Sequence, residues 1–249
     1  MSDANSEASA RFDAIQERIA AAAARSGRSS DAVRLVAVSK RQPLERIAAL
    51  VRAGARDLGE NLVQEARDKR EDLLAAIGTC EPPRWHMIGA LQRNKAALAV
   101  ELFDCVESVD RASLALELAK RAEAAGRSQL PIFLQVNISR ESQKSGTSPE
   151  TTAQLLSVCA ELPVLQPIGL MTLPAASSPE AARPAFAQLR ELRDTLRHEP
   201  GGEHLRELSM GMSSDFEVAI EEGATSVRVG TALFGEREAR PTRTNGDTT

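Results

Sequence analysis

The chain has 249 residues, of which 42% are hydrophobic and 27% charged, as in an ordinary soluble globular protein long enough for one α/β barrel. The formal net charge of −4 argues against nucleic acid or an anionic membrane surface as a partner. The longest N-terminal apolar run, residues 19–24, is too short for a signal or membrane segment, and three scattered cysteines indicate free thiols in a reducing cytoplasm.

Short β-branched runs alternate with segments of helical periodicity along the chain. A helix is predicted over residues 7–25, before the first strand. Strands are predicted at residues 35–39, 57–59, 85–89, 103–108, 132–137, 168–172, 208–211 and 226–230. Helices are predicted at residues 44–53, 62–76, 112–125, 151–161, 180–197 and 215–222. Alternation of this kind favours a parallel sheet with helical crossovers.

Eight strands are the number that closes a barrel, so we predict a single (β/α)8 TIM barrel with an extra N-terminal helix, spanning residues 7–237. An open doubly wound sheet is the alternative, because the order of strands in space cannot be read from one sequence. The polar ends of the chain, residues 1–6 and 240–249, are predicted to be disordered tails.

Lys40 stands directly after the first predicted strand and shortly before Pro43, where a helix is expected to begin. The carboxyl ends of barrel strands carry the functional groups, and desolvation there frees a nucleophilic amine by lowering its pKa. An exposed or ion-paired lysine is the alternative. The other lysines lie on predicted helices or in a polar loop: Lys69, Lys95, Lys120 and Lys144.

Polar residues also occur at the second and third strands. Gly59, Glu60 and Asn61 end the second strand, where a turn and a ligand contact explain the residues equally well. His86 alternates with apolar neighbours in the third strand, which predicts a hydrogen-bonded histidine of the core. No spacing of His, Cys, Asp and Glu indicates a metal site.

The segments that follow the seventh and eighth strands have the composition of an anion site. Ser213 and Ser214 precede a predicted helix, and Ser214 has capping-box spacing to Glu217. A capped helix without a ligand is the alternative explanation. Gly230 and Thr231 follow the eighth strand, and barrels commonly bind phosphate in these two loops.

Arg228 lies between two valines of the eighth strand and therefore needs a partner or a ligand, because an unpaired buried charge is costly. The chain has no phosphate-binding G-x-x-x-x-G-K-[ST] loop and no G-x-S-x-G elbow. These absences argue against a nucleotide hydrolase and against a serine hydrolase.

Taken together, these stretches resemble the pyridoxal phosphate homeostasis proteins, whose barrel is similar to the N-terminal domain of alanine racemase. The matching stretches occur in order from about residue 35 to 237. They are residues 35–40, 59–61, 85–89, 91–92, 94–95, 136–138, 141, 144, 146, 169–171, 208–213 and 227–235. The sequence departs from the family's pattern at Leu62, where an aromatic residue is usual, and at Ala90, where a proline is usual.

The resemblance implies that pyridoxal 5′-phosphate (PLP) is held as a Schiff base on Lys40. It also implies that Arg228 approaches the pyridine nitrogen and that Asn61 lines the pocket. The residues implied for the phosphate are Ser213, Ser214, Gly230 and Thr231. Met87 and Met210 are implied as pocket walls.

Two functions follow from the resemblance: a carrier or buffer in intracellular PLP homeostasis, and a racemase-like amino-acid enzyme. Alanine racemase, as the resemblance implies, combines such a barrel with a second, β-rich domain and uses a tyrosine as one of its two catalytic bases. This chain ends soon after the eighth strand and contains no tyrosine. An arginine at the ring nitrogen favours an unprotonated pyridine, which is a weaker electron sink, although alanine racemase itself works with such a pairing. We therefore expect a cytoplasmic, monomeric PLP carrier with little turnover, and PLP-dependent apoenzymes as its recipients.

Overall fold

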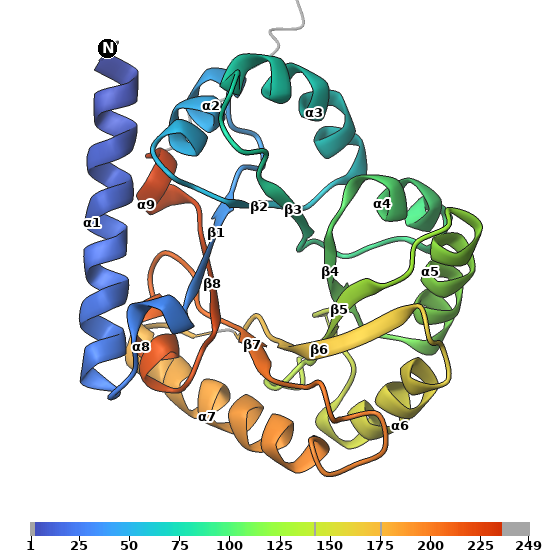
Figure 1. The fold of residues 1–249 in the computed structure, drawn as a ribbon. Coiled ribbons are helices and arrows are strands. Elements are labelled where there is room, and N and C mark those ends of the chain that lie inside the picture. Colours follow the sequence, from blue (N-terminus) through green and yellow to red (C-terminus); the bar gives the residue numbers. More distant parts are fainter. Residues whose placement is uncertain (1–2, 142, 175, 236–249) are drawn as a thin grey trace, which may run out of the picture.

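The computed structural model describes residues 3–141, 143–174 and 176–235, which form a closed barrel of parallel strands (Figure 1). The strands are β1 (Arg34–Val38), β2 (Asp57–Glu60), β3 (Arg84–Met87), β4 (Cys105–Val109), β5 (Leu130–Gln135), β6 (Leu165–Met171), β7 (Glu207–Ser209) and β8 (Ser226–Val229). Each strand pairs with the next in chain order, and β1 also pairs with β8, with Ala37 opposite Val229. This last pairing confirms the predicted TIM barrel and excludes the open sheet, whose edge strands would remain unpaired.

Helices surround the barrel on the outside (Figure 1). They are α1 (Asp3–Arg25), α2 (Leu44–Arg52), α3 (Val63–Ile77), α4 (Ala96–Leu102), α5 (Ala112–Ala124), α6 (Pro149–Ala160), α7 (Pro179–Leu196), α8 (Phe216–Glu221) and α9 (Thr231–Phe234), with short 3-10 turns η1 (Ser30–Ala32) and η2 (Arg93–Lys95). Each predicted helix agrees with an observed one to within a few residues, while α4 and α9 had no predicted bounds. Within the described ranges, no helix has the length and apolar character needed to cross a membrane.

The longer helices form where apolar side chains recur on one face, and two of them also have a side-chain cap at the first turn. In α2, Ile47, Leu50 and Val51 are buried against the barrel. Two helices, α6 and α7, begin with a serine followed by proline. The serine side chains, Ser148 and Ser178, each accept a hydrogen bond of 3.3 Å from the backbone amide three residues on. This cap, with proline at the first helical position, is a strong helix start.

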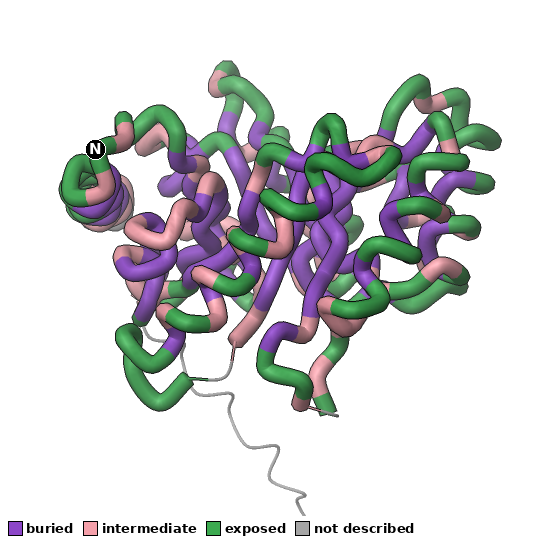
Figure 2. Tube along the Cα trace, turned by 90° about the horizontal axis from the view of Figure 1, so that it is seen from below, coloured by how far each residue is buried: buried purple, intermediate pink, exposed green. Residues whose placement is uncertain are grey.

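The strands form the buried centre of the molecule. Figure 2 shows the buried strands as purple segments between exposed green helices and loops. Because side chains alternate along a strand, one set points into the barrel and the other packs against the helices. The inward set includes the buried polar residues His86, Glu107 and Arg228.

The N-terminal helix is longer than predicted and packs outside the ring of helices. It begins at Asp3, so residues 3–6, which were predicted to be disordered, are helical instead. Figure 1 shows α1 beside the seam where β1 meets β8, and it contacts α2, α8 and α9. The buried side chains of Phe12, Ile15 and Ile19 provide the hydrophobic contact that orders this segment. The other predicted tail, residues 240–249, lies outside the described residues.

The start of α8 differs from the predicted capping box. Asp215 occupies the N-cap position, and its side chain accepts a hydrogen bond of 2.6 Å from the Met212 amide. Glu217 accepts bonds from both Nε and Nη2 of Arg18 in α1, at 3.1 and 3.2 Å, instead of returning to the cap. The capping-box prediction is therefore wrong, because a contact with α1, distant in the sequence, recruits Glu217.

Replacing Ile19 by alanine tests how strongly α1 braces the barrel. Ile19 is fully buried, so the truncation leaves a cavity at the contact, and we expect the free energy of unfolding to fall by about 3 kcal/mol. Urea unfolding followed by circular dichroism measures the change. Glu17→Ala, on the exposed side of the same helix, is the matched control and should change stability by less than about 0.5 kcal/mol. Equal effects of the two substitutions would show that α1 does not brace the barrel.

Candidate functional site

A pocket of about 690 Å³ opens at the carboxyl ends of β1, β2, β7 and β8. Most of the predicted site residues line it: Lys40, Asn61, Ser213, Ser214, Arg228, Gly230 and Thr231. Apolar side chains complete the lining: Val38, Ile88, Leu173, Met212 and Ala232. These apolar residues were not predicted as site residues, because they belong to loops and strand ends whose approach depends on barrel closure. The pocket thus combines one lysine, one buried arginine and several hydroxyls.

A partly buried ion-pair cluster holds the backbone of the turn that carries Lys40. Lys69 of α3 donates to the Ser39 carbonyl at 2.8 Å, to Glu60 at 3.0 Å and to Glu65 at 2.6 Å. The Ser39 hydroxyl donates to the same Glu60 oxygen at 2.7 Å. The three acceptors hold the Lys69 ammonium against the back of the turn. Lys40 itself is half-buried in the pocket lining, so its position is set by a well-supported backbone.

Glu60 is fully enclosed in this cluster. Burial raises the pKa of its carboxyl, and the neighbouring Lys69 and the Ser39 hydroxyl only partly offset that effect. The residue after it, Asn61, projects to the pocket from the end of β2. A Cβ atom on Gly89 would lie 2.3 Å from the Asn61 carbonyl oxygen, so only glycine permits this approach of the two segments.

The loops after β7 and β8 are joined through Ser213. Its hydroxyl oxygen accepts hydrogen bonds from the Gly230 amide at 3.2 Å and from the Ala232 amide at 3.5 Å. Ser214 and Thr231, both exposed, flank this junction and line the pocket. Asp215 rather than Ser214 occupies the N-cap position of α8, and within the described residues no side-chain hydrogen bond caps this helix. Hydroxyls gathered in this way can donate to a phosphate group.

Arg228 forms the floor of the pocket and is only 3% exposed. One terminal nitrogen donates to the Thr172 carbonyl oxygen at 2.8 Å, and the other donates to the Ser209 hydroxyl. Burial lowers the pKa of Arg228, while the charges of Glu107 and Asp215 oppose that effect. The guanidinium stays cationic, since arginine retains its proton in proteins.

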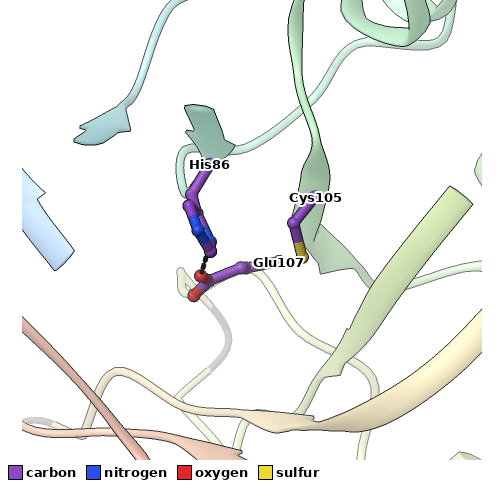
Figure 3. A group of neighbouring side chains, drawn as sticks. All are labelled: His86, Cys105 and Glu107. Atoms are coloured by element: carbon purple, nitrogen blue, oxygen red, sulfur yellow. Dashed lines mark hydrogen bonds and ion pairs between the residues drawn. The ribbon is translucent and has the colours of Figure 1, made fainter. Parts of the chain in front are cut away.

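A chain of buried polar groups continues from Arg228 into the barrel. Ser209 donates to Glu107 at 2.6 Å, and the other oxygen of Glu107 lies 2.7 Å from Nδ1 of His86 (Figure 3). The Nε2 atom of His86 lies 2.8 Å from Asp57. The prediction of a hydrogen-bonded core histidine is confirmed. Its partners were missed, because they come from β2 and β4 and are recognisable only as inward positions on separate strands.

His86, Cys105 and Glu107 place one potential metal-ligand atom each within 4.8 Å of one another, a grouping found among the described residues (Figure 3). No ligand spacing marks this group in the sequence, because the grouping arises from strand register, with His86 opposite Cys105. Both ring nitrogens of His86 already contact carboxylates. A metal ion would have to displace a shared proton, so we interpret the group as part of the polar chain.

The pH dependence of stability provides a test of the charge on His86. Burial by itself lowers the pKa of His86, but hydrogen bonds to Asp57, Cys105 and Glu107 outweigh it and raise the pKa well above its usual value. Stability from this proton is present below the unfolded pKa of about 6.5 and is lost as pH rises toward the folded pKa. We expect His86→Gln to be less stable at about pH 6 and to lose less stability up to about pH 8.

Urea unfolding at several pH values measures this difference. His198→Gln is the matched control, because His198 is exposed and its replacement should leave the wild-type slope unchanged. Parallel pH profiles for wild type and His86→Gln would show that folding does not shift the pKa of His86, and a wild-type profile that rises more steeply with pH would show a neutral His86 in the folded protein.

Met87 and Met210, implied by the resemblance as pocket walls, are not brought to the pocket lining. Both are fully buried in the main hydrophobic core. The reason is strand alternation: their neighbours His86 and Ser209 point into the barrel, so the methionines point outward toward the helices.

Comparison with known proteins gives the family. The sequence pattern of the alanine racemase N-terminal domain matches residues 11–238. The "Pyridoxal phosphate homeostasis protein" of Aquifex aeolicus is 43% identical over 229 residues, which cover 92% of this chain and 97% of that protein. The protein of the same name from Pseudomonas aeruginosa is 44% identical, over 90% of this chain and 93% of its own. The chain belongs to the family of pyridoxal phosphate homeostasis proteins.

Solved structures agree with membership in the homeostasis protein family. PipY of Synechococcus elongatus PCC7942, solved with PLP bound, is 39% identical with a TM-score of 0.76, and the match covers 89% of this chain and 100% of PipY. Alanine racemase from Corynebacterium glutamicum is 16% identical with a TM-score of 0.62, and the match covers 91% of this chain but 62% of the racemase. At that identity the racemase shows a shared fold alone.

The two departures from the homeostasis protein pattern lie away from Lys40. Leu62 is 56% exposed at the N-cap of α3 and does not belong to the lining of the main pocket. Ala90 lines a smaller adjoining pocket of about 210 Å³, which shares Asn61, Ile88 and Leu173 with the main one. Neither substitution changes the lysine, the arginine or the hydroxyls of the main pocket.

Proposed function

We propose that this chain binds PLP and acts in intracellular PLP homeostasis as a carrier, with the cofactor attached to Lys40 as a Schiff base. The observation that carries the proposal is that the Lys40 side chain and the hydroxyl cluster around Ser213 line one pocket. The names of the related proteins and the PLP bound to PipY support it.

The residues in the pocket fit the chemical groups of PLP. The Lys40 amine can form a C=N bond with the aldehyde carbon and release one water molecule, and hydrolysis or exchange with another amine reverses the step. Ser213, Ser214 and Thr231, together with the backbone at Gly230, are proposed to hold the phosphate. Asn61 is proposed to line the pocket beside the cofactor, and Arg228, at the pocket floor, is proposed to face the pyridine nitrogen.

A carrier role is favoured over efficient turnover by the groups around the pocket. When bound, PLP supplies an electron sink, whose strength depends on protonation of the ring nitrogen. Arg228 has no acceptor atom and holds only donors toward that nitrogen, which favours the unprotonated ring. The chain also contains no tyrosine to act as the second base of a racemase. A racemase-like amino-acid enzyme is the alternative, because related barrels belong to amino-acid racemases.

Two measurements test the proposal. Titration of the purified protein with PLP should give a saturable visible absorbance band, and a panel of amino acids should give turnover far below the enzyme median of about 10 s⁻¹. A protein with no affinity for PLP would contradict the binding role. Sustained turnover near the median would favour the racemase-like alternative.

The wider role extends beyond the pocket itself. We propose a monomer located in the cytoplasm, with PLP-dependent apoenzymes as the recipients of the cofactor. Size-exclusion chromatography with light scattering tests the monomer, and transfer of PLP from the loaded protein to an apoenzyme, followed by the appearance of enzyme activity, tests the recipient.

A further inference from the structure

We infer that the buried polar chain from Asp57 to Arg228 supports the cofactor ring, and that His86 and Glu107 are positioning residues that orient Arg228. The inference rests on the proposed function, because it concerns PLP in the pocket. It adds residues that lie behind the pocket and touch no bound group. This polar chain consists of Asp57, His86, Glu107, Ser209 and Arg228.

Each member of the polar chain comes from a different strand, so the chain crosses the barrel interior. Its members lie, in the order given, on β2, β3, β4, β7 and β8. The contacts from Asp57 to His86, His86 to Glu107 and Glu107 to Ser209 measure 2.8, 2.7 and 2.6 Å. All five residues are at most 4% exposed. A continuous path of short bonds therefore links the pocket floor to the opposite end of the barrel.

Charges alternate along this path. Asp57 and Glu107 carry the negative charges, and His86 and Arg228 carry the positive ones. Other groups facing the chain are Cys105 beside His86, Arg84 at 2.9 Å and Arg34 at 3.9 Å from Asp57, and Asp215 near Arg228. Because an isolated buried charge is costly, removing one member changes the proton state of its neighbours. The charge on His86 and the orientation of the Arg228 guanidinium are coupled in this way.

Ser209 is the link through which Glu107 acts on Arg228. The Ser209 hydroxyl has one proton, and it is donated to Glu107, so its lone pairs are left for the guanidinium. This bond and the one to the Thr172 carbonyl fix two of the guanidinium nitrogens. The plane of Arg228, and with it the direction of the remaining donors toward the pocket, follows from the charge on Glu107.

Glu107→Gln and Ser209→Ala break this link at neighbouring points. Glu107→Gln keeps the shape and removes the charge, while Ser209→Ala removes one oxygen and keeps both charges. Ser226→Ala is the matched control: Ser226 is buried on the same strand as Arg228, and its hydroxyl oxygen has no hydrogen-bond partner within the described residues. Because Ser209→Ala is a minimal change, it keeps the test valid if Glu107→Gln does not fold.

The first readout needs no cofactor. In ¹⁵N-edited NMR of the PLP-free protein, the His86 ring should carry protons on both nitrogens at neutral pH, with His86→Gln used for assignment. In Glu107→Gln the ring should lose one proton within the range of about pH 5 to 8, where an imidazole titrates. A His86 ring with the same proton state in wild type and Glu107→Gln would overturn the coupling.

The second readout uses the PLP-loaded protein. We expect the pH midpoint of its visible absorbance band to shift by about one unit, a tenfold change in proton affinity, in Glu107→Gln and Ser209→Ala but not in Ser226→Ala. Unchanged midpoints in both variants, with a normal band in wild type, would overturn the inference alone. No band in wild type at saturating PLP would contradict the proposed function, while the NMR readout would still decide the coupling.

Discussion

Lys40→Ala is expected to abolish covalent retention of PLP. Lys40 contributes its amine to the lining of the main pocket, and the hydroxyl cluster around Ser213 lines the same pocket. After reduction with borohydride, intact-mass spectrometry should detect one fixed cofactor per wild-type chain and none in the variant. Non-covalent binding through the phosphate site should persist, so the affinity measured without reduction should fall less than the covalent fraction.

Lys120→Ala is the matched control for this experiment, because Lys120 is exposed on α5, away from the pocket. It should retain the full covalent fraction. Peptide mapping of the reduced wild-type protein should place the cofactor on Lys40. A fixed cofactor on another lysine in Lys40→Ala, at the wild-type level, would contradict the assignment of Lys40.

Gly211→Ala is expected to lower the free energy of unfolding by about 4 kcal/mol, the largest stability effect that we predict. Gly211 has a φ of +92°, and a Cβ atom there would lie 2.6 Å from the Ala219 side chain and 2.8 Å from the Phe216 backbone. The substitution therefore combines backbone strain with a clash against α8, which follows the Ser213 loop. PLP affinity should weaken together with stability, and urea unfolding and titration measure the two effects.

Gly223→Ala separates the two causes. Its φ of +100° is similar, but the nearest atom to an added Cβ is a flexible Arg190 side-chain carbon at an ordinary 3.4 Å. We expect a loss of about 1–2 kcal/mol from backbone strain alone, with unchanged PLP affinity. Equal losses in the two variants would show that the contact between Gly211 and α8 is unimportant.

The barrel and much of its pocket could be predicted from the sequence because both depend on local patterns. Strand runs end in polar residues, and the ends of parallel strands gather at one face of a barrel. Lys40, Ser213 and Thr231 lie two to four residues after the ends of β1, β7 and β8, so their placement near one another follows from closure. The identity of the cofactor required the resemblance, since composition and spacing indicated only an amine and an anion site.

The remaining features depend on contacts between distant segments. The direction of Glu217 was set by Arg18, which is far away in the sequence and has no local signal. Met87 was assigned to the pocket although alternation with His86 places it outward, an error that a strict strand period would have avoided. The polar chain was not predicted because no member has a distinctive sequence pattern on its own strand. Only the register of the closed barrel brings the members together.

The pairing of β1 with β8 also bears on the synthesis of the protein. The second partner of β1 becomes available only when residue 229 has left the ribosome, almost 200 residues after β1 itself. At translation rates of about 5–20 residues per second this interval is roughly 10–40 s. During that time β1 has an unpaired edge, and α1 lacks its contacts with α8 and α9. The nascent chain therefore exposes an unpaired strand edge, which can pair with other chains, until synthesis is nearly complete.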